Sequence, residues 1–235
     1  MRVHVILPAA GIGTRMAAGA HTAAPKQFME LGGVPILIHS LRAYAAIPSV
    51  STIVVAVRVN EMERVQSQVS EHGLAGRVKV VEGGDNRQQS VANAVAALDA
   101  APNDPVLVHD AVRPLITPAI IQHTIDAIEK HGAAIVALPA VDTIKQVERT
   151  ADGAIITATI PRERIVQAQT PQGARFELMQ RAFKDAAEAD FVGTDEASLL
   201  ERIGVEVSVV HGSPRNFKIT QPGDLELAEF YLTQG

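Results

Sequence analysis

The sequence predicts an α/β fold: a Rossmann-like, mostly parallel sheet with helices on both faces, plus one inserted β-hairpin arm. Apolar runs alternate with amphipathic stretches up to about residue 138, which is typical of repeated strand–helix units. A chain of 235 residues, 47% hydrophobic and 20% charged, is ordinary for a globular protein with a full core. The first apolar run also breaks directly into small residues and glycines, as first strands do when the next loop binds an anion.

Five apolar runs are the expected strands, and the amphipathic stretches between them are the expected helices. The strands are expected at residues 3–7, 53–57, 78–81, 106–109 and 133–138, and the helices at 36–47, 61–72, 88–98 and 119–131. Ligands of parallel sheets lie beyond the carboxyl ends of the strands, so we look for site residues there.

The strand–helix alternation is interrupted at about residues 140–162. Two β-rich segments flank Asp152 and Gly153, which predicts a hairpin. A lone hairpin is marginal in water, so this one must pack either on its own subunit or on a partner. A helix at 176–187, an apolar segment at 205–210, a strand at 217–220 and a helix from near Pro222 then complete the chain. No repeat or linker divides the sequence, so we expect a single domain, 1–235, with the arm at about 140–162.

Composition excludes several classes of protein. There is no cysteine, and the eight histidines have no metal-ligand spacing, so a disulfide scaffold and a zinc enzyme are not expected. A net charge of −5 with 3% aromatic residues argues against a nucleic-acid partner. No apolar run reaches the roughly 18 residues of a membrane span and no signal peptide is evident, so we expect a cytoplasmic protein.

Residues 8–27 form the most informative segment. Gly11 and Gly13 allow the backbone N–H groups to wrap an anion, and Arg15 and Lys26 add two cations. Neither a Walker P-loop nor a dinucleotide fingerprint fits, because no Lys-Ser or Lys-Thr follows the glycines and the third glycine of the fingerprint is missing. The alternative is a glycine-rich loop that binds no phosphate. The two cations favour a nucleoside triphosphate site.

Three further segments carry candidate site residues. Gly84, Asp85 and Ser90 lie between an expected strand and helix, where they could either read the edge of a cytosine or, for Asp85, cap the helix. Asp110 ends a strand and could hold Mg²⁺ or a substrate hydroxyl, or could simply pair with Arg113 in a surface turn.

The third segment is near the C-terminus and has plain structural explanations. Thr194 precedes two acidic residues in a good helix N-cap sequence. Lys218 alternates with apolar neighbours in an expected strand and could point into solvent.

Taken together, the motifs resemble one family. The chain is similar to the 2-C-methyl-D-erythritol 4-phosphate cytidylyltransferases of the non-mevalonate isoprenoid pathway, over nearly its whole length. The motifs that carry the resemblance, in order, are A-A-G-x-G-T-R-M, P-K-Q, G-G-D-x-R…S, H-D-A-V-R-P, V-D-T-I-K, T-P-Q, T-D-E-A-S and N-F-K-I-T-x-P-x-D-L. The resemblance implies transfer of a cytidylyl group from CTP to the polyol phosphate with release of pyrophosphate, a need for Mg²⁺ or another divalent cation, and a homodimer.

The resemblance also implies residue roles. Arg15, Lys26 and Lys218 would be catalytic, with Arg15 and Lys26 on the triphosphate. The divalent cation would help to offset the repulsion between the phosphates, and Asp110 is its candidate ligand. The residues implied to bind the nucleotide are Ala9, Ala10, Gly11, Gly13, Gly84, Asp85 and Ser90. Those implied to bind the polyol phosphate are Asp110, Arg113, Thr194 and Lys218, with Thr143 and Arg162 reaching the site of a partner subunit.

The segment between Arg15 and the P-K-Q motif, residues 16–24, is longer than is usual in the family. Three rival functions fit parts of the pattern: a ribitol 5-phosphate cytidylyltransferase, a hexose-1-phosphate nucleotidyltransferase, which is usually longer, and a non-catalytic nucleotide-binding module on the same fold. Such a module is expected to lose the loop cations, whereas this chain retains them.

Overall fold

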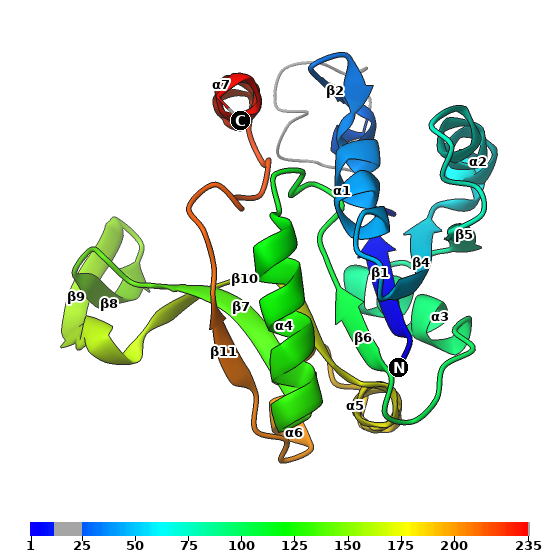
Figure 1. Ribbon diagram of the computed structural model, residues 1–235. Helices are drawn as coiled ribbons and strands as arrows, with labels where there is room; N and C mark the ends of the chain where they lie inside the picture. Colours follow the sequence, from blue (N-terminus) through cyan, green and yellow to red (C-terminus); the bar gives the residue numbers. More distant parts are fainter. Residues whose placement is uncertain (12–24, 235) are drawn as a thin grey trace.

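A seven-stranded sheet forms the centre of the structure, a computed structural model that describes residues 1–11 and 25–234 (Figure 1). The strand order is β11-β7-β10-β6-β1-β4-β5. All neighbours are parallel except the two pairs made by β10, which is antiparallel to β6 and β7. The strands are β1 (Val3–Pro8), β4 (Val50–Val57), β5 (Val78–Glu82), β6 (Pro105–Val108), β7 (Ala133–Pro139), β10 (Val166–Arg175) and β11 (Ser208–His211).

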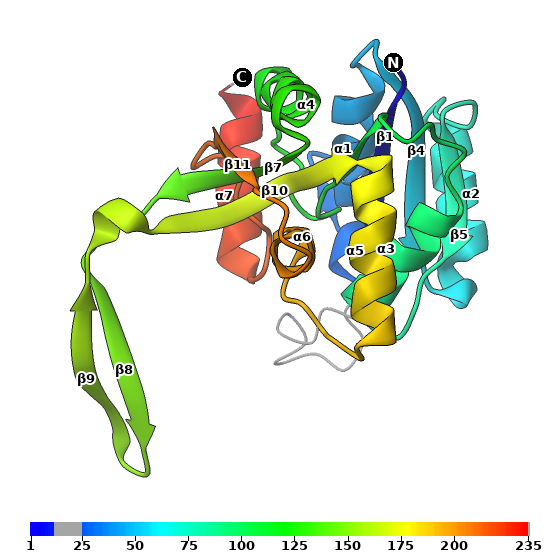
Figure 2. The same ribbon diagram turned by 90° about the horizontal axis from the view of Figure 1, so that it is seen from below.

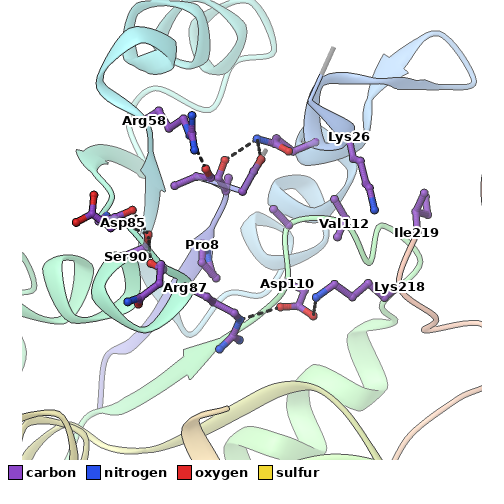
Figure 3. A pocket seen from close by; sticks show the side chains of 17 residues that line it. Pro8, Lys26, Arg58, Asp85, Arg87, Ser90, Asp110, Val112, Lys218 and Ile219 are labelled. Atoms are coloured by element: carbon purple, nitrogen blue, oxygen red, sulfur yellow. Dashed lines mark hydrogen bonds and ion pairs between the residues drawn. The ribbon is translucent and has the colours of Figure 1, made fainter. Parts of the chain in front are cut away.

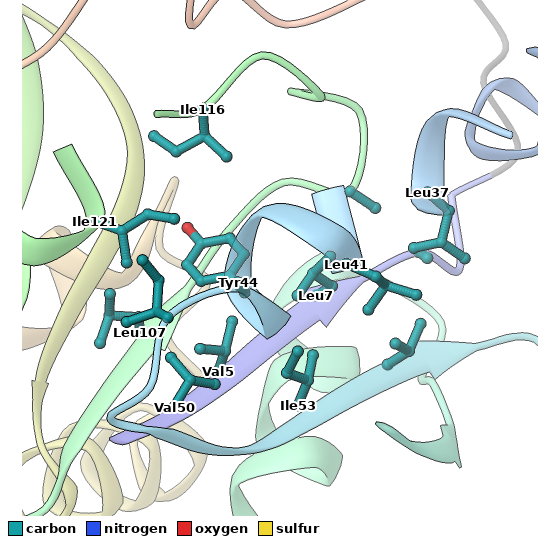
Figure 4. Packing of buried hydrophobic residues seen from close by; sticks show 14 of the residues in the cluster. Val5, Leu7, Leu37, Leu41, Tyr44, Val50, Ile53, Leu107, Ile116 and Ile121 are labelled. Atoms are coloured by element: carbon teal, nitrogen blue, oxygen red, sulfur yellow. The ribbon is translucent and has the colours of Figure 1, made fainter. Parts of the chain in front are cut away.

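Helices cover both faces of this sheet, as the sequence predicts. Alternate side chains of β1 enter different cores: Val5 and Leu7 pack on one face and Ile6 on the other. In Figure 4, Leu41 and Tyr44 of α1 lie over Val5 and Leu7. The first face is covered by α1 (Ile36–Ala45), α2 (Met62–Glu71) and α4 (Pro118–His131), and the second by α3 (Arg87–Ala96), α5 (Phe176–Glu188) and α6 (Glu196–Arg202). None of the described helices is long and apolar enough to cross a membrane.

A small third core closes the C-terminal edge of the sheet. The helix α7 (Pro222–Thr233) places Ala228 against Leu31 and Ile36. The paired strands β2 (Glu30–Leu31) and β3 (Val34–Pro35) and the 3₁₀ turn η1 (Lys26–Phe28) precede α1 in the chain. A second 3₁₀ turn, η2 (Val59–Glu61), precedes α2.

One expected strand is wrong, and one strand was missed. Residues 217–220 form no strand; Ile219 makes a single backbone hydrogen bond, from its N–H to the Val112 carbonyl at 2.9 Å. The strand β10 was not expected, because its sequence contains no apolar run. Its buried polar residues are instead satisfied by distant groups: Gln172 Nε2 donates to Asp195 Oδ2 at 3.0 Å.

The expected hairpin is present and projects from the body of the molecule (Figures 1 and 2). It consists of β8 (Ile144–Thr150) and β9 (Gly153–Ile160), paired antiparallel and followed by the 3₁₀ turn η3 (Arg162–Arg164). Val141, Ile155 and Ile156 are 78%, 62% and 60% exposed. The hairpin therefore leaves apolar side chains uncovered by its own subunit within the described residues.

Candidate active site

A cavity of about 370 Å³ opens at the carboxyl ends of β1, β4, β5 and β6 (Figure 3). It is where the alternation of strands and helices predicts a ligand site. Nine of the residues expected in the site line it: Ala9, Ala10, Gly11, Lys26, Gly84, Asp85, Ser90, Asp110 and Lys218. Gly13 and Arg15 lie outside the described residues.

The loop after β5 is built around the hydroxyl of Ser90. Its Oγ accepts a hydrogen bond from the Gly84 N–H at 3.0 Å and donates to the Asn86 carbonyl at 2.8 Å. The side chain of Asn86 accepts from the Gln89 N–H at 2.9 Å, so Asn86 and not Asp85 caps α3. A Cβ on Gly84 would lie 2.3 Å from Cβ of Gln89, which explains glycine there. The carboxylate of Asp85 is left at the exposed rim of the cavity.

Asp110 lies at the centre of a cluster of three cations. Its Oδ2 is 3.1 Å from Lys218 Nζ and 3.3 Å from Arg113 Nε, and its Oδ1 is 3.3 Å from Arg87 Nε. Burial alone would raise the pKa of this carboxyl, but the three adjacent cations hold it well below its usual value. Asp110 is therefore a permanent anion that fixes the directions of the cations around it.

Lys218 does not simply point into solvent, although its side chain is 42% exposed. Its ammonium group contacts Asp110 from one side and lines the cavity from the other (Figure 3). Lys26 occupies the same side of the cavity, where its Nζ donates to the Thr220 carbonyl at 2.8 Å.

The ion pair between Arg87 and Glu196 was missed by sequence reasoning. Arg87 donates from Nη1 and Nη2 to the two oxygens of Glu196 at 2.6 and 3.0 Å, and Glu196 is 2% exposed. Burial disfavours the charge of Arg87, but the carboxylates of Glu196 and Asp110 raise its pKa above the usual value. Arg87 stands inside the G-G-D-x-R motif, so the signal was present, but its partner is 109 residues away.

His109 supports the position of Asp110 through the hydroxyl of Thr170. Thr170 Oγ1 accepts from the Asp110 N–H at 3.1 Å and lies 3.0 Å from His109 Nδ1, while His109 Nε2 lies 3.1 Å from the Arg113 carbonyl. Burial lowers the pKa of His109 to about 4, so the ring is neutral at pH 7. A neutral, fully enclosed imidazole acts here as a structural support.

Four expected site residues lie outside the cavity. Arg113 is buried behind Asp110 and donates from Nη1 to the Asn216 carbonyl at 2.7 Å. Thr194 borders a smaller hollow shared with Arg87, and the N-cap of α6 is Asp195 rather than Thr194. Thr143 and Arg162 are exposed at the base of the arm, where Arg162 Nη1 donates to the Val141 carbonyl at 2.6 Å. Their contribution to the site of a partner stays a prediction.

The described side chains of the cavity form no divalent-cation site of their own. The described residues contain no group of three His, Asp or Glu side chains that could bind a metal ion. Asp110 has a cation on each oxygen, so a metal ion there would face three positive charges. The expectation that Asp110 is a metal ligand is therefore not favoured by the charges around it.

A cation-rich cavity at the carboxyl edge of an α/β sheet, beside a glycine-containing first loop, has the form of a site for nucleoside triphosphates, which is the class of site that a nucleotidyltransferase needs. The sequence model of the 2-C-methyl-D-erythritol 4-phosphate cytidylyltransferase family matches residues 3–234 of this chain. The chain belongs to that family.

Relatives and solved structures agree with this assignment. A 2-C-methyl-D-erythritol 4-phosphate cytidylyltransferase from Acidobacterium capsulatum is 70% identical over 100% of this chain and 98% of that protein. One from Solibacter usitatus is 51% identical over 100% and 97%. The crystal structure of the Francisella tularensis enzyme of the same name is 34% identical with a TM-score of 0.80, covering 98% of this chain and 99% of that one. The 4-diphosphocytidyl-2C-methyl-D-erythritol synthase of Anaerococcus prevotii is 28% identical with a TM-score of 0.82, covering 99% and 98%.

Proposed function

We propose that this chain transfers the cytidylyl group of CTP to 2-C-methyl-D-erythritol 4-phosphate, giving 4-diphosphocytidyl-2-C-methyl-D-erythritol and pyrophosphate for isoprenoid precursor synthesis. The observation that carries the proposal is the cavity that gathers Lys26, Lys218 and the Asp110 cluster beside the first loop. Family membership selects the two substrates.

The reaction is an in-line displacement. A phosphate oxygen of the polyol phosphate attacks the α-phosphorus of CTP, and the bond from that phosphorus to the β-phosphate oxygen breaks to release pyrophosphate. The nucleophile is ionised near neutral pH, so no strong base is needed. The main requirement is to align two polyanions and offset their repulsion, which Lys26 and Lys218 supply from the same side of the cavity.

The substrates are assigned to different parts of the cavity. The nucleoside of CTP is expected against the loop after β5 and the start of the first loop. Its triphosphate is expected against the backbone N–H groups further along the first loop, together with Lys26 and Arg15. The polyol phosphate is expected beside Lys218 and Asp110, extending towards Thr194 in the smaller neighbouring hollow. Arg113, which lies behind Asp110, acts through that carboxylate.

Three further features belong to the proposal. A divalent cation accompanies the triphosphate of CTP, since Mg²⁺ commonly binds through substrate phosphates. The protein forms a homodimer in which Thr143 and Arg162 of the arm reach the partner's site. It works in the cytoplasm.

Pyrophosphate release tests the reaction. CTP is incubated with 2-C-methyl-D-erythritol 4-phosphate, ribitol 5-phosphate and hexose 1-phosphates in turn, and the first is expected to have by far the highest kcat/KM. Preferred turnover of ribitol 5-phosphate would support the rival cytidylyltransferase, and no turnover of any acceptor would support a non-catalytic nucleotide-binding module.

The same assay tests the choice of base. The buried polar groups of such a site form hydrogen bonds with one base. When another base is bound, some of these groups have no hydrogen-bond partner, which costs several kcal/mol of binding free energy. We therefore expect ATP and GTP to react at least about a hundredfold more slowly than CTP. Comparable rates with purine nucleotides would contradict the assignment of Gly84, Asp85 and Ser90 to cytosine.

A further inference from the structure

Three consecutive carbonyl oxygens of the first loop are held by side-chain donors. Gln27 Nε2 donates to the Ala9 carbonyl at 2.6 Å and to the Gly11 carbonyl at 3.3 Å. Arg58, labelled in Figure 3, donates from Nε to the Ala10 carbonyl at 2.9 Å. Gln27 comes from η1 and is 6% exposed, whereas Arg58 follows β4. The loop is therefore held by two elements that are distant in the sequence.

This arrangement determines where the N–H groups of the loop point. In a trans peptide the carbonyl and the following N–H point in opposite directions, so fixing the Ala9 and Ala10 carbonyls also fixes the N–H groups of Ala10 and Gly11. The Ala9 N–H donates to the Ala56 carbonyl at 2.8 Å. No described residue accepts a hydrogen bond from the N–H of Ala10 or Gly11, and both residues line the cavity.

Gly11 adds a second observation. A Cβ built on it would meet no atom of the described residues within 4 Å, so none of them occupies the space beside its backbone. Packing against described atoms does not explain glycine here. A ligand that approaches the backbone closely does, as in other loops that bind phosphate through N–H groups.

We propose that Gln27 and Arg58 are positioning residues that aim the N–H groups of Ala10 and Gly11 at the phosphate oxygens of CTP. The proposal rests on the proposed function, since that function supplies CTP. Because Gln27 and Arg58 hydrogen-bond the carbonyls of the same peptide groups, the N–H donors are already oriented before the nucleotide binds and need no reorganisation. Gln27 lines the cavity but has no charge, and its amide N–H groups donate to the Ala9 and Gly11 carbonyls, so it acts through the loop and not by attracting the triphosphate.

Gln27→Met tests the proposal, because methionine has a similar shape and no donor. We expect KM for CTP to rise about tenfold, with KM for the polyol phosphate within about twofold of wild type, and a Tm that falls by only a few degrees because the loop loses two hydrogen bonds. The matched control is Gln122→Met, which removes a glutamine that donates to Asp126 Oδ1 at 2.8 Å on the exposed face of α4. Titration calorimetry with CTP alone should give the same tenfold loss of affinity.

Arg58→Met tests the same loop from the β4 side, and it keeps the proposal falsifiable if Gln27→Met does not fold. Its matched control is Arg175→Met, since Arg175 also donates to a backbone carbonyl, that of Glu129 at 3.0 Å, far from the cavity. KM for CTP is again expected to rise, with the polyol phosphate unaffected.

A folded Gln27→Met protein whose KM and affinity for CTP match wild type would overturn the proposal, as would equal rises in both KM values. A wild-type protein that binds CTP but releases no pyrophosphate would instead overturn the proposed function, and the calorimetric comparison would still decide the role of Gln27.

Discussion

In the proposed reaction, Lys26 is the described residue on which the chemistry depends most directly. Its Nζ lies at the cavity, held by the Thr220 carbonyl, where it can offset charge that develops as pyrophosphate leaves. We expect Lys26→Ala to lower kcat by roughly a hundredfold or more, with a smaller change in KM for CTP. Arg15→Ala should behave alike.

Steady-state pyrophosphate release measures the effect of Lys26→Ala. Lys79→Ala is the matched control, because Lys79 Nζ also donates to a backbone carbonyl, that of Ala97 at 2.9 Å, but outside the cavity. A near-normal kcat in Lys26→Ala would mean that this loop does not contact the reacting phosphates.

His109 makes stability depend on pH. Its native pKa is about 4 against 6.5 for a free imidazole, so the unfolded chain binds the proton first as the pH falls. The contribution of the neutral ring is complete above about pH 6.5 and is lost towards pH 4, a total of about 3 kcal/mol. Burial also lowers the pKa of His4, which adds to the same trend.

Urea denaturation at a series of pH values checks this prediction. The free energy of unfolding of the wild type should fall between pH 6.5 and pH 4, and His109→Gln, which has no titrating ring at this position, should show a flatter curve. Parallel curves for the two proteins would contradict a buried neutral His109.

At the level of single residues, the sequence indicated Asp110 and Lys218 because each stands in a short motif, and the structure places them 3.1 Å apart. It did not indicate Glu196 as the partner of Arg87, because no spacing relates residues on α3 and α6. Buried ion pairs of this kind depend on the packing of whole helices, which one sequence does not reveal.

Among the elements, β10 illustrates what the sequence could not predict. The alternation of apolar and amphipathic segments predicted the parallel strands, because their apolar side chains face the cores on both sides of the sheet. β10 instead relies on buried polar groups, such as Gln169 and Gln172, whose partners lie far along the chain. Its position between β6 and β7 therefore had no local signal.

Gly173 fixes β10 against β6. A Cβ on Gly173 would lie 2.2 Å from the Val106 carbonyl oxygen and 3.0 Å from Ile128 Cδ1, and the carbonyl cannot move without disturbing the sheet. We expect Gly173→Ala to lower the free energy of unfolding by about 1–3 kcal/mol. Denaturant unfolding measures the change. Gly76→Ala, where a Cβ meets no described atom within 4 Å, should change it by less than about 0.5 kcal/mol. A Gly173→Ala protein as stable as wild type would show that β6 and β10 can move apart enough to accommodate the methyl group without loss of stability.

For the whole molecule, the arm raises the question of assembly. It projects from the body with apolar side chains exposed, and a two-stranded hairpin is marginal alone in water (Figure 2). A symmetric partner that covers these side chains would explain both features, and it would bring Arg162 of one subunit towards the polyol phosphate of the other. Arginine binds phosphate through charge-assisted bonds, so Arg162→Ala should raise KM for the polyol phosphate far more than for CTP.

Mixed dimers separate a shared site from one that is complete in each subunit. Lys26→Ala and Arg162→Ala proteins are each expected to be nearly inactive at low polyol phosphate. In a mixed dimer, the core of the Arg162→Ala chain retains Lys26 and receives Arg162 from the other chain, so one intact site is restored.

An equimolar mixture that exchanges subunits freely should recover about a quarter of wild-type activity, since half of its dimers are mixed and each has one intact site out of two. Exchange is verified by mass spectrometry with one isotope-labelled chain. Recovery of no activity after verified exchange, or an active monomer in sedimentation, would mean that the arm serves its own subunit.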